Sequence, residues 1–92
     1  MTITRITDVK DTLYPAFRRL YEQSFPVFEQ RDDKQQAKAF GSTDYHLDVY
    51  HEESDIVGFI AYWEFDSYLY IEHFAIHNRL RGQGYGQKLL RE

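Results

Sequence analysis

The chain contains no cysteine among its 92 residues, which excludes disulfides, a thiolate nucleophile and a cysteine metal site. It also lacks any apolar run approaching the ~18 residues of a membrane span. No apolar segment typical of a secretory signal follows Arg5. We therefore expect a cytoplasmic protein that does not insert into membranes. The length predicts one small domain spanning residues 1–92.

Charge is unevenly distributed along the chain. Residues 31–66 carry nine acidic and three basic side chains, whereas residues 67–92 carry two acidic and four basic ones. Without a basic stripe, nucleic-acid binding is not expected. The two regions are either solvated faces of opposite sign or sites for two different ligands. In the second case the acidic region would attract a cationic amine and the basic region an anion.

Hydrophobic periodicity predicts a strand at residues 3–7 and a helix over residues 13–24, with Asp8 or Asp11 as its cap and Pro15 in its first turn. A second helix follows Asp32 or Asp33 and ends at Gly41. The three later strands are expected at residues 45–51, 56–65 and 68–76, and a final helix is expected from Tyr85. Short turns between these strands imply antiparallel neighbours, so the fold class is α+β.

Three of the five glycines lie in one short stretch, Arg81-Gly82-Gln83-Gly84-Tyr85-Gly86, between an apolar strand and a helix. Such a turn lets backbone N–H groups and a helix N-terminus approach a phosphate or pyrophosphate. The spacing fits neither the P-loop nor the dinucleotide-binding fingerprint. The remaining alternative without a ligand is an ordinary glycine-rich turn.

The pattern R-x-x-G-x-G, formed by Arg81, Gly84 and Gly86 after the strand at residues 70–76, resembles the GNAT N-acetyltransferase family. The resemblance covers essentially the whole chain. It implies a mixed, mainly antiparallel sheet flanked by helices, truncated after the start of the third helix. It also implies acetyl-CoA as the cosubstrate and transfer of an acetyl group to a primary amine of a small molecule or peptide.

The resemblance also implies the residues that bind acetyl-CoA. The backbone of Phe74, Ala75 and Ile76 would pair with the pantetheine arm. The pyrophosphate would be bound by a second set: Arg81, Gly82, Gln83, Gly84, Tyr85, Gly86 and Gln87. No metal is expected, because the histidines lack a spacing such as H-E-x-x-H.

Glu72 is the candidate catalytic residue. Strict alternation along residues 68–76 would place it on one face with Tyr70 and Phe74, and His73 on the other face as a structural residue. An acid among aromatic side chains loses hydration, which suits it to general-base chemistry. In the resembling family, a glutamate here commonly deprotonates the acceptor amine, often through water. The alternative is a glutamate paired with a base or facing solvent.

Fold analogy alone suggests that the segment between the first two helices shapes the acceptor pocket, through Phe25, Phe28, Glu29 and Asp33. The family's domain continues past this point with a further strand and a tyrosine that protonates the leaving thiolate. Two other functions therefore remain open: a non-catalytic CoA-binding module, or a fragment that dimerises through an open sheet edge.

Overall fold

The computed structural model describes residues 1–53, 55–77 and 84 of the chain. In order, its elements are β1 (Thr2–Ile6), α1 (Tyr14–Ser24), the 3-10 turn η1 (Val27–Glu29), α2 (Asp33–Phe40), β2 (Tyr45–Glu52), β3 (Asp55–Phe65) and β4 (Tyr68–Ile76). The predicted elements within the described residues are all present, with bounds that differ by at most one residue. The predicted final helix lies outside the described residues.

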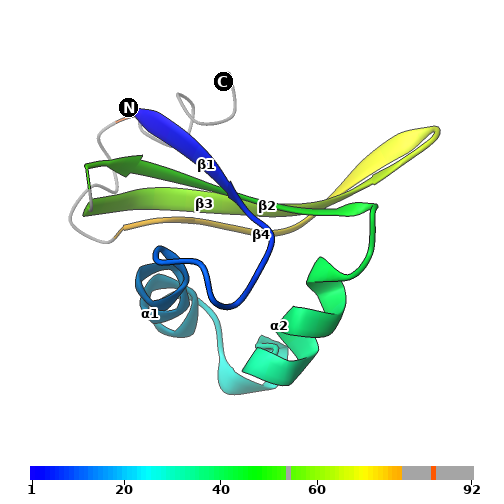
Figure 1. The fold of residues 1–92 in the computed structure, drawn as a ribbon, viewed down its shortest axis with the longest axis horizontal. Coiled ribbons are helices and arrows are strands. Elements are labelled where there is room, and N and C mark those ends of the chain that lie inside the picture. Colours follow the sequence, from blue (N-terminus) through cyan, green and yellow to red (C-terminus); the bar gives the residue numbers. More distant parts are fainter. Residues whose placement is uncertain (54, 78–83, 85–92) are drawn as a thin grey trace.

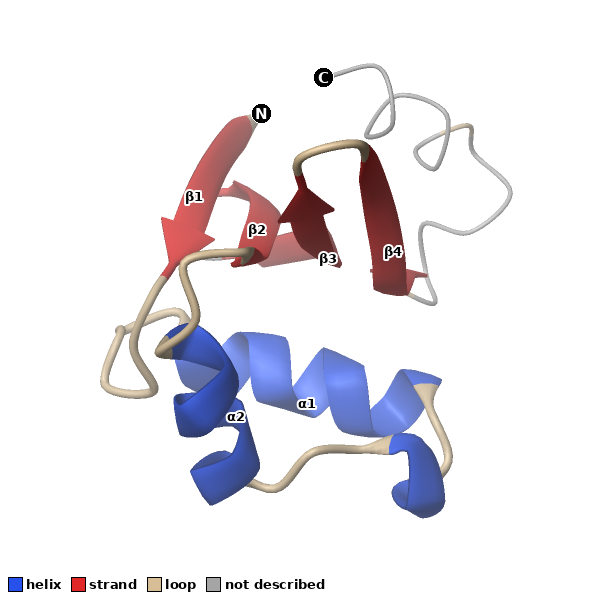
Figure 2. Cartoon of the chain, turned by 90° about the vertical axis from the view of Figure 1, so that its right-hand side faces the viewer, coloured by secondary structure: helices blue, strands red, loops and turns tan. Residues whose placement is uncertain are grey.

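The four strands form one antiparallel sheet in the order β1-β2-β3-β4. Both helices lie against the same face of this sheet, so the described chain has two layers (Figures 1 and 2). The hairpin that joins β3 to β4 extends beyond the helices at one end of the sheet (Figure 1). The fold class is therefore α+β, as predicted.

The two helices begin for different local reasons. Pro15 occupies the first turn of α1, as predicted, but the N-cap is Leu13 and makes no side-chain hydrogen bond. The prediction that Asp8 or Asp11 caps α1 was wrong, because the Asp11 carboxylate accepts the N–H of Leu13 before the helix begins. In contrast, Asp32 caps α2 in a reciprocal capping box with Gln35.

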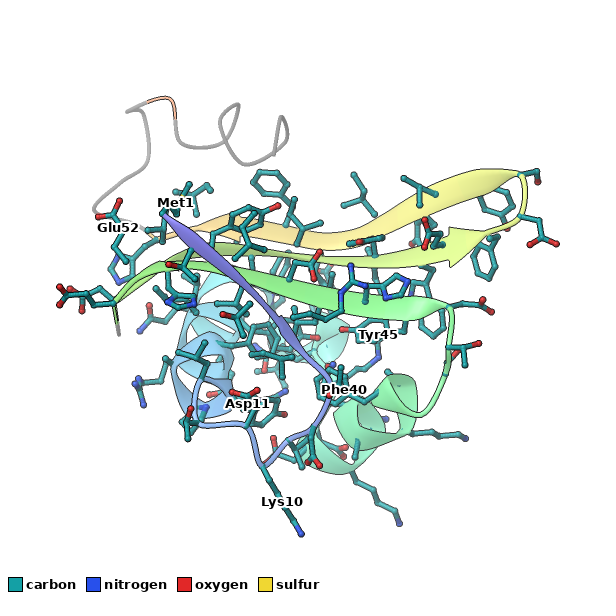
Figure 3. The ribbon with its side chains drawn as sticks, turned by 45° about the horizontal axis from the view of Figure 1, so that its top comes forward. Met1, Lys10, Asp11, Phe40, Tyr45 and Glu52 are labelled. Carbon is teal, nitrogen blue, oxygen red and sulfur yellow. The ribbon has the colours of Figure 1, made fainter. Side chains whose placement is uncertain are left out.

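The core lies between the helices and the sheet. Phe17 and Tyr21 of α1 pack against Phe59 of β3, with Phe17 and Phe59 fully buried. At the other end, Phe40 of α2 contacts Tyr45 of β2, and both are labelled in Figure 3. A second, smaller cluster lies on the sheet face away from the helices and includes Tyr50, Val57, Ile60 and Ile76. Among the described residues, no helix has the length and hydropathy needed to cross a membrane.

Candidate active site

A β-bulge in β4 determines the direction of Glu72. Tyr62 pairs with Ile71 and Ala61 pairs with His73, so Glu72 has no partner on β3. The extra residue interrupts the strict alternation of faces. Glu72 and His73 both point toward the helices, and His73 Nδ1 lies 3.9 Å from Glu72 Oε1. Placing them on opposite faces was therefore wrong.

Because of the bulge, the side chains of Glu72 and Phe74 lie on opposite faces of the sheet. Phe74 packs on the second cluster, on the face away from the helices. Tyr70 remains on the face of Glu72, because it pairs with Trp63, which packs against the main core. The prediction that Glu72 shares its face with two aromatic residues is therefore correct for Tyr70 and wrong for Phe74.

The Glu72 carboxylate is held by two donors. Arg31 Nη2 lies 2.5 Å from Oε1 and 2.7 Å from Oε2, and Trp63 Nε1 donates to Oε1 at 3.1 Å. The side chains of Arg31 and Glu72 are 19% and 24% exposed, so solvent screens the pair less than at an open surface. The structure therefore has Glu72 paired with a base rather than facing solvent, and its role as a general base stays a prediction. It also has an indole as a second donor.

Arg31 is itself fixed in place by aromatic residues of the core. Its backbone N–H donates to the hydroxyl of Tyr21 at 2.8 Å. Its guanidinium lies over the ring of Tyr45, 5.4 Å from the centroid, in a cation–π contact. The next residue, Asp32, caps α2. The segment before α2 therefore presents a positioned guanidinium to β4.

His73 packs within the aromatic core. Its ring contacts Tyr21 and Phe25 edge-on, with centroid distances of 4.9 and 4.7 Å. Burial lowers the pKa of His73, against the opposing effect of the Glu72 carboxylate. A neutral, buried imidazole fits the predicted structural role, although its face was predicted wrongly.

A cleft of about 430 Å³ opens beside the Arg31–Glu72 pair, between α2 and the sheet. Arg31 and Trp63, the two donors to Glu72, both line it. The other described lining residues are Gln35, Lys38, Ala39 and Ser42. Glu72 is not one of the lining residues, and its carboxylate is connected to the cleft through its hydrogen bonds to Arg31 and Trp63.

The predicted pantetheine contacts lie at the end of β4. Among the described strands, β4 is at the edge of the sheet, with β3 on one side. The N–H of His77 donates to the carbonyl of Val57 on β3. Since alternate N–H groups of a strand point the same way, the N–H of Ala75 also points to β3 and that of Phe74 points to the outer edge. This geometry suits a ligand that pairs with the strand.

Gly84 is the one residue of the glycine-rich turn among the described residues. Its φ of +81° lies in the left-handed region, which glycine adopts without strain. A Cβ at this position would meet no atom within 4 Å. Backbone conformation, rather than lack of space within the protein, therefore favours glycine here. Six predicted cofactor residues lie outside the described residues: Arg81, Gly82, Gln83, Tyr85, Gly86 and Gln87.

The four residues suggested for the acceptor pocket are not brought together as a group. Phe25 packs in the core against His73 and Phe59. Phe28 is 86% exposed on η1, and Glu29 is also exposed. Asp33 accepts a hydrogen bond from the Tyr14 hydroxyl, and burial together with this contact raises the pKa of Tyr14. The described cleft lies instead beside Arg31 and Trp63.

Residues 11–92 match the model of the acetyltransferase (GNAT) family. The chain belongs to the GNAT family. A search of curated proteins finds no match. Among solved structures, a GNAT-family protein from Bacteroides thetaiotaomicron, assigned as an acetyltransferase, is 30% identical and superimposes with a TM-score of 0.83. The comparison covers 99% of this chain and 52% of that one.

Two further solved structures share the GNAT fold at lower identity. An aminoglycoside acetyltransferase from an uncultured soil metagenomic sample, solved with sisomicin, is 22% identical with a TM-score of 0.72. The comparison covers 98% of this chain and 64% of that one. The IAA acetyltransferase of Bacillus cereus ATCC 14579 is 22% identical with a TM-score of 0.64, over 98% and 53% of the two chains. This GNAT chain thus spans between half and two thirds of the length of these structures.

Sequence reasoning missed Arg31 and Trp63. Arg31 falls in a segment that periodicity indicates only as a loop. The sequence did contain one signal for Trp63. Pairing the residues on either side of the tight turn at Asp66 and Ser67 sets Trp63 opposite Tyr70, which lies two residues before Glu72. Nothing comparable predicts Arg31, whose contact with Glu72 spans 41 residues of sequence.

Proposed function

We propose that this GNAT chain carries the cosubstrate and general-base elements of an N-acetyltransferase that acts on a primary amine. The observation that carries the proposal is the position of Glu72. Its carboxylate lies at a bulge in an edge strand, beside a cleft and two residues before the predicted pantetheine contact at Phe74. General-base chemistry needs an oriented carboxylate within reach of the acceptor nitrogen.

Two features of the described residues support acetyl-CoA as the cosubstrate. The outward carbonyl of Phe74, which points the same way as its N–H, can accept a hydrogen bond from an amide N–H of the pantetheine arm. The left-handed φ of Gly84 suits a turn that directs N–H groups to a pyrophosphate. When bound, acetyl-CoA supplies the thioester carbonyl that the amine attacks.

In the proposed transfer the amine nitrogen would form a bond to the thioester carbon, the C–S bond would break, and CoA would leave as a thiolate that takes up a proton from water. The described residues would supply three other roles. Glu72 accepts a proton from the amine, directly or through one water, so that the nitrogen lone pair becomes available. Arg31 and Trp63 keep the carboxylate oriented throughout. The outward N–H of Phe74 is the proposed donor to the developing negative charge on the carbonyl oxygen.

Binding of CoA to Gly84 variants tests the cosubstrate assignment. Gly84→Val should weaken CoA binding by ~10-fold or more, because a β-branched residue is strained at positive φ. Gly84→Asn is the matched control, since asparagine tolerates the left-handed region and should retain more affinity. Isothermal titration calorimetry measures both. Binding by Gly84→Val that equals the parent chain would contradict the assignment.

A further inference from the structure

The charge of the cleft beside Glu72 differs from that of the surrounding sequence. Residues 31–66 are predominantly acidic, yet the described lining of the cleft contains two cationic side chains, Arg31 and Lys38, and no carboxylate. Gln35 and Ser42 add an amide and a hydroxyl. The lining is therefore rich in hydrogen-bond donors, with the indole of Trp63 as its aromatic wall.

The two cations differ in how far they are neutralised within the described part of the chain, since Arg31 pairs with Glu72 and Lys38 has no such partner. Lys38 is exposed on α2, and no carboxylate of the described residues lies within ion-pair distance of it. Arg31 uses Nη2 for Glu72, whereas its Nη1 is buried without a hydrogen-bond partner among the described residues. Lys38 is therefore the cation that can pair directly with an anionic ligand, and the guanidinium of Arg31 adds a second positive group to the lining.

We propose that the acceptor is an amine that also carries an anionic group, a carboxylate or a phosphate, and that this group binds at Lys38 and Arg31. The inference rests on the proposed function, because it assigns the cleft to the acceptor. The amine would face Glu72, and the anion would lie toward α2. A polycation such as a polyamine or an aminoglycoside lacks the complementary charge, although the acidic composition of residues 31–66 favours such an acceptor.

Trp63 provides a direct measurement, because it is the chain's single tryptophan and lines the cleft. The fluorescence of Trp63 can be followed while the protein is titrated, in the absence of CoA, with one of four amines: β-alanine, O-phosphoethanolamine, propylamine or spermidine. At least one anionic amine should bind ~10-fold or more tightly than propylamine, as expected for a charge-assisted hydrogen bond. The tighter of the two anionic amines distinguishes a carboxylate from a phosphate.

A matched pair of lysine variants localises the effect. Lys38→Gln removes the cation that lines the cleft and should weaken binding of the preferred anionic amine by ~3–10-fold. Lys34→Gln removes an exposed cation of the same helix that does not line the cleft, and should change binding less than twofold. Both positions are exposed, so both variants should fold, which a thermal melt verifies.

The outcomes separate this inference from the proposed function. Propylamine or spermidine binding as tightly as both anionic amines, or equal effects of Lys34→Gln and Lys38→Gln, would overturn the inference while CoA binding remained intact. Normal CoA binding by Gly84→Val would instead contradict the cosubstrate assignment, even if the anionic amines bound at Lys38 as expected.

Discussion

At the scale of single residues, Glu72 and Arg31 define the chemistry of the cleft. A guanidinium fixed by Tyr21 and Tyr45 holds the carboxylate from one side, and Trp63 holds it from another. A carboxylate held by two donors keeps a fixed orientation relative to Arg31 and Trp63. Some lone pairs of its oxygens already accept hydrogen bonds from Arg31 and Trp63. The acceptor amine must therefore approach the lone pairs that remain.

Glu72→Gln tests the proposed general base. Glutamine keeps an oxygen for Arg31 and Trp63 but cannot accept the proton, so acetyl transfer should fall by ~10²–10⁴-fold. The measurement is steady-state turnover of acetyl-CoA with an accepted amine, alongside CoA affinity, which should not change. Glu64→Gln, at an exposed glutamate of β3, is the control. Near-normal turnover of Glu72→Gln would remove Glu72 from this role.

At the scale of elements, the start of α2 links helix capping to the site. The capping box of Asp32 and Gln35 fixes the backbone where the chain enters α2, and Arg31 directly precedes it. A cap side chain satisfies N–H groups that the first turn leaves unpaired. The cap therefore supports the position of Arg31 as well as the helix.

Asp32→Ala should lower the free energy of unfolding by ~1 kcal/mol through loss of the cap. Urea denaturation measures this change, with Lys34→Ala in the same helix as a control that should be nearly neutral. The same variant should make the position of Arg31 less fixed. Because Arg31 and Trp63 both donate to the Glu72 carboxylate, the fluorescence of Trp63 should change as well. An unchanged unfolding midpoint would show that the capping box does not stabilise the fold.

Element types and most of their bounds could be predicted because they depend on local patterns. Alternating apolar residues and tight turns indicate β2, β3 and β4, and Asp32 is a favoured cap residue before a helix. The bulge at Glu72 could not be predicted in this way. It depends on how β4 registers against β3, and a one-residue offset exchanges the faces of all residues beyond it.

At the scale of the whole molecule, His73 ties the stability of the fold to pH. Burial lowers its pKa in the folded state, so the unfolded chain binds the proton more readily. The stabilisation is present above the unfolded pKa of about 6.5 and is lost as the pH falls below it. Among the charged groups near the ring, Glu72 raises the pKa of His73 and so opposes the effect of burial, whereas Arg31 lowers this pKa further.

We therefore expect the free energy of unfolding to decrease between pH 7.5 and pH 5, with His73 contributing at most ~1.4 kcal/mol per pH unit. His73→Phe should make this decrease shallower, because phenylalanine fills the aromatic site without titrating. Chemical denaturation of both proteins over this pH range measures the difference. Equal slopes would show that His73 does not titrate on unfolding.

The amino-acid sequence alone was enough to predict the α+β class, the antiparallel order of the last three strands and the resemblance to the GNAT family. These features depend on local periodicity, turn residues and the motif around Gly84. The choice of Glu72 also came from sequence, whereas its catalytic role stays a prediction. The folded structure was needed to show that Glu72 and His73 share a face and that Arg31 and Trp63 hold the carboxylate. The physical reason is that strand register and contacts between distant segments arise from packing, which no local pattern encodes.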